Sequence, residues 1–197
     1  MRERILETTR RLLQERGLAH LTIKAIADEL DVTKQAVLYW FPSKNQLLQE
    51  FYVEALEQEA LFFRRVIDAA GSGADAVESF LMEGYAYHAS DFSMFRLVYL
   101  LPQLDRSATD LMDKEVAEER IYPKTSQFYD ALEEKLATSP GLPDDVNPRT
   151  LAVSLHMALI GHICVAGQMD ALEDSFKQTF EQMLEALCGL VRCCLSG

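Results

Sequence analysis

Residues 22–48 constrain the fold of this chain more than any other stretch, because they read as two short amphipathic helices separated by a tight turn. Ile23, Ile26 and Leu30 fall at offsets of 0, 3 and 7, so they share one face of the first helix. After a short break, Thr33 can cap the second helix by accepting a hydrogen bond from a free backbone N–H group. The spacing therefore predicts a helix pair that packs through its apolar faces.

The second helix of this pair divides into an inner and an outer side. Val37 and Trp40 are three residues apart, so we expect both to hold the helix against the core. Lys34, Gln35 and Tyr39 are then left facing outward. A helix pair with an exposed second helix is the layout of a helix-turn-helix motif, whose second helix enters the major groove of DNA.

The exposed side chains of this motif suit contact with bases and phosphates. Lys34 can pair with guanine acceptors, and Gln35 can bind adenine in a bidentate way. Lys24 and Lys44 lie near helix starts, where backbone N–H groups attract phosphate, although an ordinary solvated charge is the alternative for both. The expected DNA contacts are Thr22, Lys24, Thr33, Lys34, Gln35, Ala36, Tyr39 and Lys44.

The same segment resembles the N-terminal module of TetR-type (TetR/AcrR) transcriptional regulators. The matching features are the apolar pattern of residues 5–13, Gly17, Thr22, the Ile26-Ala27 pair, Val32-Thr33-Lys34 and the exit Phe41-Pro42-Ser43-Lys44. Two positions depart from the family, which usually has Gly where this chain has Asp31 and Tyr where it has Leu38. The resemblance covers about the first 50 of 197 residues.

The resemblance implies a three-helix DNA-binding domain over residues 1–46 and a larger helical-bundle domain for ligand binding and dimerisation over residues 47–197. It implies a homodimeric transcriptional regulator of double-stranded operator DNA that responds to a small-molecule effector. Repression is the mode of action it implies, with activation left open. We call the helix-turn-helix pair within residues 22–40 the reader. Two readers related by two-fold symmetry require a palindromic operator, with half-sites about one helical turn apart or a multiple of it.

Helical spacing recurs along the whole chain and no stretch shows sustained strand-type alternation, so we predict an all-α fold. One helix over residues 108–138 should be kinked at Pro123, which lies inside it. Asp170 and Glu173 resemble a capping box that opens the last helix. The nine expected helices are about 2–16, the reader pair within 22–40, one long helix from 43 to the break at 71–73, 74–89, 92–101, 108–138, 148–167 and 170–194.

Large side chains with polar tips are frequent in the middle of the chain and suit a pocket for a small, mostly apolar ligand. Tyr85 and His88, three apart on one helix face, are the best polar pair. Plain core packing is the alternative for most of these residues. The expected ligand contacts are Met82, Tyr85, His88, Phe92, Phe95, Tyr99, Tyr122 and Met157.

The last two helices carry broad apolar stripes, and Gly161 permits close approach of backbones. The resemblance implies a four-helix bundle with two helices from each subunit, whereas packing against their own core is the alternative. The expected dimerisation residues are Leu151, Leu155, Leu159, Phe176, Phe180, Met183, Leu184 and Leu187.

Charge is divided unevenly along the chain. Residues 1–50 contain eight Lys/Arg and seven Asp/Glu, a net charge of +1. Because the whole chain has a net charge of −12, residues 51–197 carry −13. The acidic second part should face away from DNA, and non-specific affinity should be modest and salt-dependent. An acidic helical dimer that binds a protein or a ligand without binding DNA is therefore the alternative function.

The sequence lacks the signals that mark several other classes of protein. No apolar run approaches the roughly 18–20 residues that span a bilayer, and the N-terminus has no signal-peptide pattern, so we expect a cytoplasmic protein without membrane contact. The four cysteines, Cys164, Cys188, Cys193 and Cys194, form no C-x-x-C pair and are expected in the core rather than at a metal. The chain has no Glu-x-x-His, Gly-rich phosphate loop or G-x-S-x-G, so we expect no cofactor and no enzyme.

Overall fold

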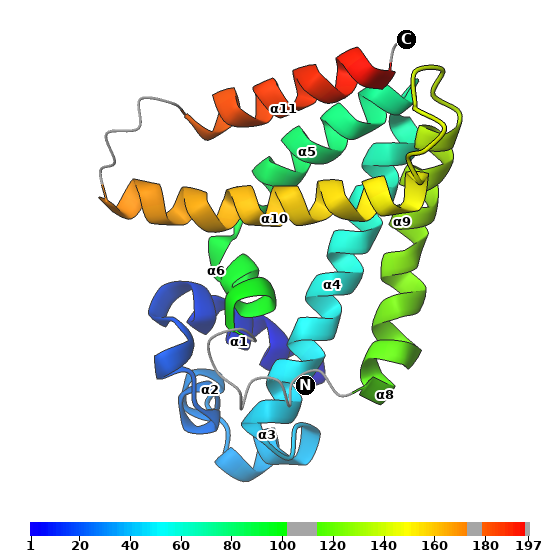
Figure 1. Cartoon of the computed structure of the whole chain (residues 1–197). Helices are drawn as coiled ribbons and strands as arrows, with labels where there is room; N and C mark the ends of the chain where they lie inside the picture. Colours follow the sequence, from blue (N-terminus) through cyan, green and yellow to red (C-terminus); the bar gives the residue numbers. More distant parts are fainter. Residues whose placement is uncertain (102–113, 173–178, 196–197) are drawn as a thin grey trace. The chain divides into compact units, whose positions relative to one another are not determined.

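The computed structural model describes residues 1–101, 114–172 and 179–195, without the side chains of residues 166–172 and 180. Every regular element in these ranges is a helix, which confirms the all-α prediction. The elements in Figure 1 are α1 (Arg2–Arg16), η1 (Leu18–His20), α2 (Ile23–Leu30), α3 (Lys34–Trp40), α4 (Lys44–Ala69), α5 (Gly73–Ser90), α6 (Phe92–Phe95), η2 (Arg96–Leu100), α8 (Lys114–Val116), η4 (Ala117–Ile121), α9 (Tyr122–Ala137), α10 (Pro148–Leu172) and α11 (Phe180–Leu195).

Side-chain caps begin several of the described helices, including the one predicted at Thr33. The capping oxygen accepts the backbone N–H three residues further on, at 3.0 Å for Thr22, 3.2 Å for Thr33, 3.1 Å for Ser43 and 2.8 Å for Asn147. Each such bond satisfies an N–H group that the helix leaves free, and contributes about 1 kcal/mol. At the other end of α1, Gly17 adopts a φ of +72°, which glycine tolerates without strain.

The boundary between the last two helices differs from the prediction. Helix α10 continues through Gly167 and Asp170, so neither residue ends or opens a helix. A glycine inside a helix costs only about 1 kcal/mol, which other interactions can offset. The capping box of α11 lies later: the Thr179 N–H donates to Gln182 Oε1 at 2.9 Å, and the Gln182 N–H donates to Thr179 Oγ1 at 3.3 Å. Glu173 lies outside the described residues.

The predicted kinked helix over 108–138 also takes another form. Its described part consists of α8, the π-helical turn η4 and α9. Pro123 lies in the first turn of α9, where its missing N–H needs no partner, so the irregularity precedes the proline as a π turn. A second π turn, η2, occupies part of the predicted helix over 92–101. Residues 108–113 lie outside the described ranges.

The chain divides into two compact units. The boundary falls inside α4, after Leu56. Packing defines these units, so the functional domain boundary after residue 46 stays a prediction. The described part of the first unit is residues 1–56, 91–101 and 114–120, and that of the second is 57–90, 121–172 and 179–195.

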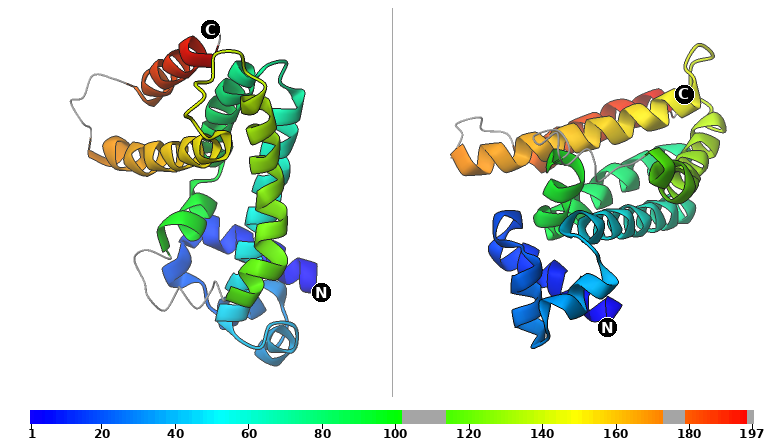
Figure 2. Two further views of the ribbon diagram at one scale, coloured as in Figure 1. Left: turned by 45° about the vertical axis from the view of Figure 1, so that its right-hand side comes forward. Right: turned by 90° about the horizontal axis from the view of Figure 1, so that it is seen from below.

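In the first unit, α1, α2 and α3 lie beside the first turns of α4 (Figure 2). Arg10 covers part of the core edge, with its guanidinium 5.1 Å from the ring centroid of Phe51. Full burial of a large apolar side chain contributes about 1.5–3 kcal/mol, so the buried apolar side chains of these helices account for the cohesion of the unit. Its deeply buried large side chains include Ile5, Leu12, Leu21, Ile26, Val37, Phe41, Leu47, Phe51 and Leu97.

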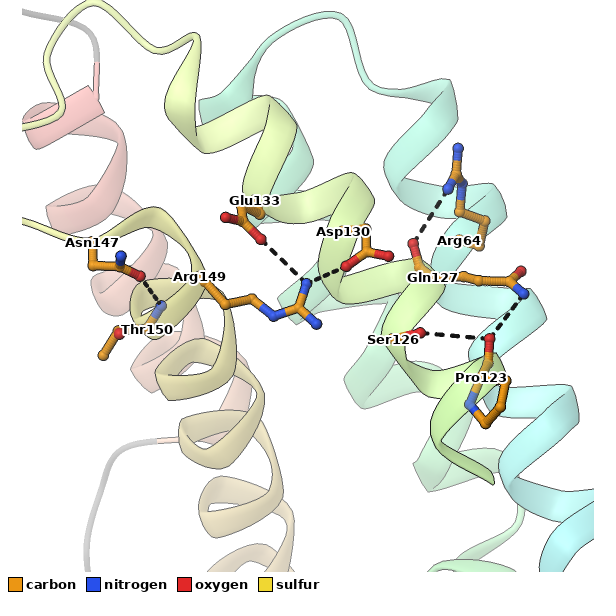
Figure 3. A network of polar contacts seen from close by, with 9 residues as sticks. All are labelled: Arg64, Pro123, Ser126, Gln127, Asp130, Glu133, Asn147, Arg149 and Thr150. Carbon is orange, nitrogen blue, oxygen red and sulfur yellow. Dashed lines mark hydrogen bonds and ion pairs between the residues drawn. The ribbon is translucent and has the colours of Figure 1, made fainter. Parts of the chain in front are cut away.

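In the second unit, α5 packs against α9, α10 and α11. Gly84 permits this close packing, because a Cβ there would lie 2.7 Å from both Leu159 Cδ2 and Phe63 Cε1. Polar contacts add to it at the surface: Arg149, near the start of α10, bonds Asp130 and reaches Glu133 Oε2 at 3.2 Å, both on α9 (Figure 3). These contacts hold the helices of the second unit in a fixed arrangement.

Candidate nucleic-acid interface

Helix α2 and the turn after it position the outer helix of the reader. Ile23 and Ile26 are buried, as their spacing predicted, Ala27 is buried beside them, and Leu30 is half-buried. The chain reverses at Asp31, whose φ of 53° and ψ of 48° are left-handed, and the Val32 N–H donates to the Ala27 carbonyl at 3.0 Å. Asp adopts this conformation more readily than most residues other than glycine, so Asp31 supports the turn in which the family usually has glycine.

Helix α3 presents its polar side to solvent. Val37 is completely buried and holds α3 against the core. Lys34, Gln35 and Tyr39 are exposed, as predicted, and Tyr39 is 80% exposed. Ala36 is half-buried beside them. The outer side of α3 is therefore a row of polar and aromatic side chains with free access to a partner.

The prediction that Trp40 packs in the core is wrong, because Trp40 is 45% exposed. Helix α3 ends at this residue, and the backbone of Phe41 is extended, with φ of −133° and ψ of 92°. Phe41 consequently takes the core position and is buried. The Trp40 ring instead contacts the Tyr39 ring edge-on, at 5.6 Å between centroids. The Phe-Pro exit was the sequence signal that could have located this change.

The residues predicted to contact phosphates differ in their surroundings. Thr22, Thr33 and Lys24 are exposed. Lys44 is half-buried, and its ammonium group donates to the Leu18 carbonyl at 3.4 Å. Burial also lowers the pKa of Lys44. Lys44 thus ties the start of α4 to η1, and a phosphate contact at Lys44 stays a prediction.

Ion pairs moderate the positive charge near the reader. The Glu29 carboxylate on α2 accepts hydrogen bonds from Arg11 at 2.8 Å and from Arg16 at 3.4 Å. The Arg11 hydrogen bond and charge hold the pKa of Glu29 below its ordinary value. Because two arginines of α1 are paired in this way, they add little to the field that DNA would meet.

The predicted ligand-binding residues divide between the units. His88 is buried, Met82 and Tyr85 are half-buried, and Tyr122 and Met157 are exposed. The second unit holds Met82, Tyr85, His88, Tyr122 and Met157, and the first holds Phe92, Phe95 and Tyr99. Ligand binding by these residues stays a prediction.

Three of the eight predicted dimerisation residues are buried within their own unit. A second copy could therefore cover little more of these three, Leu155, Leu159 and Leu184. Leu151, Met183 and Leu187 are half-buried, Phe176 lies outside the described residues, and the side chain of Phe180 is not described.

A different apolar face of α10 is exposed. Val153, Met157 and Val165 lie at four- and eight-residue intervals on one ridge with Gly161, and Met157 is 52% exposed. On α11, Leu190 is 68% exposed. The stretch Pro148–Val165 is apolar and long enough to cross a membrane, a weak criterion that helices of soluble proteins also meet.

The cysteines lie both in the core and at the surface. Cys188 is buried, as predicted, and burial raises the pKa of its thiol. Cys164 is half-buried, whereas Cys193 and Cys194 are exposed, so the prediction of a core position is wrong for these two. They lie in the last turn of α11, where the helix presents both to solvent. Within the described ranges, no three Cys, His, Asp or Glu side chains are grouped to hold a metal ion.

Comparison with known proteins gives one sequence match and several structural ones. The profile of the "Bacterial regulatory proteins, tetR family" matches residues 5–51. No curated protein sequence shows significant similarity to the chain. A protein of unknown function from Rhodococcus sp. RHA1 has a TM-score of 0.74 at 12% identity, over 100% of this chain and 95% of that one.

Two further structures belong to named regulators. A TetR/AcrR-family transcriptional regulator from Thermobifida fusca YX-ER1 has a TM-score of 0.64 at 19% identity, over 97% of this chain and 96% of that one. The fatty acid degradation regulator FadR from Bacillus halodurans has a TM-score of 0.69 at 14% identity, over 97% and 94%. At such identities the likeness establishes a shared fold.

A capped helix pair, a left-handed turn and an exposed outer helix define a DNA-binding protein of the helix-turn-helix class. The profile match covers this motif, and the fold similarity extends along the whole chain. Residues 5–51 therefore form a DNA-binding module of the TetR family, as the sequence resemblance indicated, and the chain as a whole shares the fold of solved TetR-type regulators. Members of this family are in general not enzymes.

Proposed function

We propose that this chain represses transcription by binding a palindromic operator as a homodimer, and that a small, mostly apolar effector releases it. The observation that carries the proposal is the outer side of α3. Lys34, Gln35, Tyr39 and Trp40 are all exposed on this helix, whereas Val37 is the buried anchor. Major-groove recognition requires a helix that packs on the protein core through one side and exposes the other side to DNA.

The proposed contacts follow from side-chain chemistry. Lys34 and Gln35 have the donors and acceptors that distinguish guanine and adenine in the major groove. Tyr39 can donate to a phosphate, and exposed Trp40, which the sequence prediction had not included, can pack on the sugar or on a thymine methyl group. Each subunit would read only a short half-site, so two copies are needed for useful specificity.

The exposed ridge of α10 supports the proposed dimer. Val153, Met157 and Val165 leave apolar surface uncovered within one copy, and Gly161 has no neighbour within 4 Å of an added Cβ. A second copy on this ridge would bury that surface and let two backbones approach closely. We accordingly propose this ridge as the interface, with half-buried Leu151, Met183 and Leu187 at its margin.

Effector binding is proposed for the second unit, where half-buried Met82 and Tyr85 combine an adaptable apolar surface with a hydroxyl group. An effector that binds more tightly to a conformation with misplaced readers would lower operator affinity by that difference in binding free energy. We also propose that the protein acts in the cytoplasm, by binding rather than by catalysis.

Selection of bound DNA from a random pool tests the proposal. A palindrome with half-sites about one helical turn apart, or a multiple of it, is the expected result. The alternative, an interaction-only dimer, predicts no enriched sequence and no mobility shift even at low salt. That outcome would overturn the DNA-binding proposal.

A further inference from the structure

Four side chains from four helices of the second unit meet in its interior and form what we call the buried polar centre: Glu59 on α4, His88 on α5, Tyr129 on α9 and His156 on α10. Glu59 is 4% exposed, and its carboxylate oxygens lie 3.8 Å from His88 Nε2 and 3.6 Å from His156 Nε2. The other ring nitrogen of His156, Nδ1, is 2.5 Å from the Tyr129 hydroxyl. A connected set of polar groups thus links four helices.

Aromatic rings line the buried polar centre. The Phe63 ring centroid lies 6.2 Å from that of His88 and 5.7 Å from that of His156. The Phe128 ring centroid lies 5.4 Å from that of His156. Such rings solvate an ionic charge poorly, so each charge added to the centre is costly. In keeping with this, burial raises the pKa of Tyr129 to about 12.

Charged groups around the centre have their own partners. The Arg149 guanidinium lies 5.3 Å over the Tyr129 ring and is paired with two carboxylates of α9. On α11, which also packs against α5, Arg192 is paired with Glu78. Arg149 nevertheless acts on the centre, because its charge opposes the rise in the pKa of Tyr129.

Burial lowers the pKa of His88, while Glu59 opposes this shift and His156 adds to it. When the pH is above 6.5, the ordinary pKa of imidazole, His88 is neutral in both the packed and the solvated state. When the pH is below 6.5, a solvated His88 binds a proton and the packed one stays neutral. Acidification therefore favours a loosened state. The equilibrium constant between the packed and the loosened state changes by up to about tenfold per pH unit for each extra proton that the loosened state binds.

We propose that the buried polar centre is a pH-sensitive device: acidification favours a loosened state in which His88 is solvated and protonated, and this loosens the packing of α4, α5, α9 and α10 and weakens operator binding. The operator part rests on the function proposed above, whereas the proton part is independent of it.

Unfolding in urea at several pH values tests proton binding. The wild type is compared with His88→Gln and with His162→Gln, a matched control because the His162 ring bonds a carbonyl of its own helix at 2.7 Å. Between about pH 7.5 and pH 5.5, the unfolding constant of the wild type and the control should rise about tenfold more than that of His88→Gln. An equal rise in all three proteins would overturn the proposal.

Histidine NMR signals provide a second measurement that needs no His88 variant to fold. The chain has four histidines, and Gln variants of His20 and His162 assign two of them. At least one remaining signal should titrate well below about 6.5, and Glu59→Gln should move the His88 pKa lower still. Titration of all four signals near 6.5 would contradict the proposal.

Operator affinity tests the regulatory part. The ratio of wild-type to His88→Gln affinity for the selected operator should fall at least about threefold between about pH 7.5 and pH 5.5. Proton-linked unfolding without that fall would overturn the regulatory part. Absence of DNA binding by both proteins at every pH would contradict the repressor proposal instead, and the histidine titration would then decide the proton site.

Discussion

The Arg120 guanidinium donates to both carboxylate oxygens of Glu50, at 2.6 Å to Oε1 and 3.1 Å to Oε2. Arg2 donates to the same carboxylate at 2.6 Å, so one side chain of α4 joins α1 to η4 within the first unit. We expect Arg120→Ala to destabilise this unit by about 1 kcal/mol, since the pair is bidentate but partly screened by solvent. Urea unfolding measures the change.

Lys114→Ala is the matched control for that prediction. The Lys114–Glu118 pair spans 3.6 Å, and its side chains are 86% and 56% exposed. Removing it should change stability by less than about 0.5 kcal/mol. Equal losses for Lys114→Ala and Arg120→Ala would show that the bidentate geometry adds nothing. A loss for Arg120→Ala that added salt does not reduce would show that the contribution is not electrostatic.

Acid should remove the contribution of Glu50. The hydrogen bond from Arg120, helped by the charges of Arg120 and Arg2, lowers the pKa of Glu50 from its ordinary value of 4.5. The folded state therefore binds fewer protons, so this stability is present above 4.5 and is lost as the pH falls through the lower folded value. The stability difference between wild type and Glu50→Gln, measured by urea unfolding from about pH 6 to about pH 3, should shrink. A difference that stays constant would refute this assignment.

The left-handed turn predicts opposite outcomes for two substitutions of Asp31. Asp31→Gly should leave stability nearly unchanged, because glycine adopts a φ of 53° without strain. Asp31→Ala should cost about 1 kcal/mol, because a Cβ is disfavoured there and the Asp side chain is lost. Thermal unfolding of the two variants is the measurement, and an Asp31→Ala protein as stable as Asp31→Gly would contradict the turn geometry.

Signals within one or two helical turns were sufficient to predict the reader. The caps at Thr22, Thr33 and Asn147 each involve a backbone group only three residues away, so local chemistry determines them. Trp40 was different, because its environment depends on where α3 ends. The extended backbone at the next residue, Phe41, turns that side chain inward in its place.

Contacts between distant residues could not be predicted in this way. Sequence spacing pairs His88 with Tyr85 on one helix face, whereas the structure brings His88 to Glu59 and His156. Such contacts depend on how helices pack, which periodicity in a single sequence does not define. Periodicity likewise shows that the Leu155 face of α10 is apolar, but not whether its own core or a second copy covers it.

The proposed dimer interface predicts the effect of a charge on α10. Met157→Glu should weaken self-association by about 2 kcal/mol or more, because the carboxylate would be buried in an apolar interface. Leu61→Glu is the control, since Leu61 is 57% exposed on α4 and lies outside the proposed interface. Sedimentation equilibrium gives the dissociation constants. Unchanged self-association of Met157→Glu would place the interface elsewhere.

The most direct test of the account is the operator affinity of the double variant Gln35→Ala, Tyr39→Ala. Its control is Gln58→Ala, Leu61→Ala, which removes two exposed side chains of α4 from the second unit. Titration of the selected operator at fixed salt should show a loss of at least about 100-fold for the reader variant. It loses the Gln35 base contact in each subunit, worth about 1–3 kcal/mol each, together with the Tyr39 phosphate contacts. The control should bind like the wild type, and helicity should be unchanged in both. Equal operator affinity of the two double variants would contradict recognition through α3.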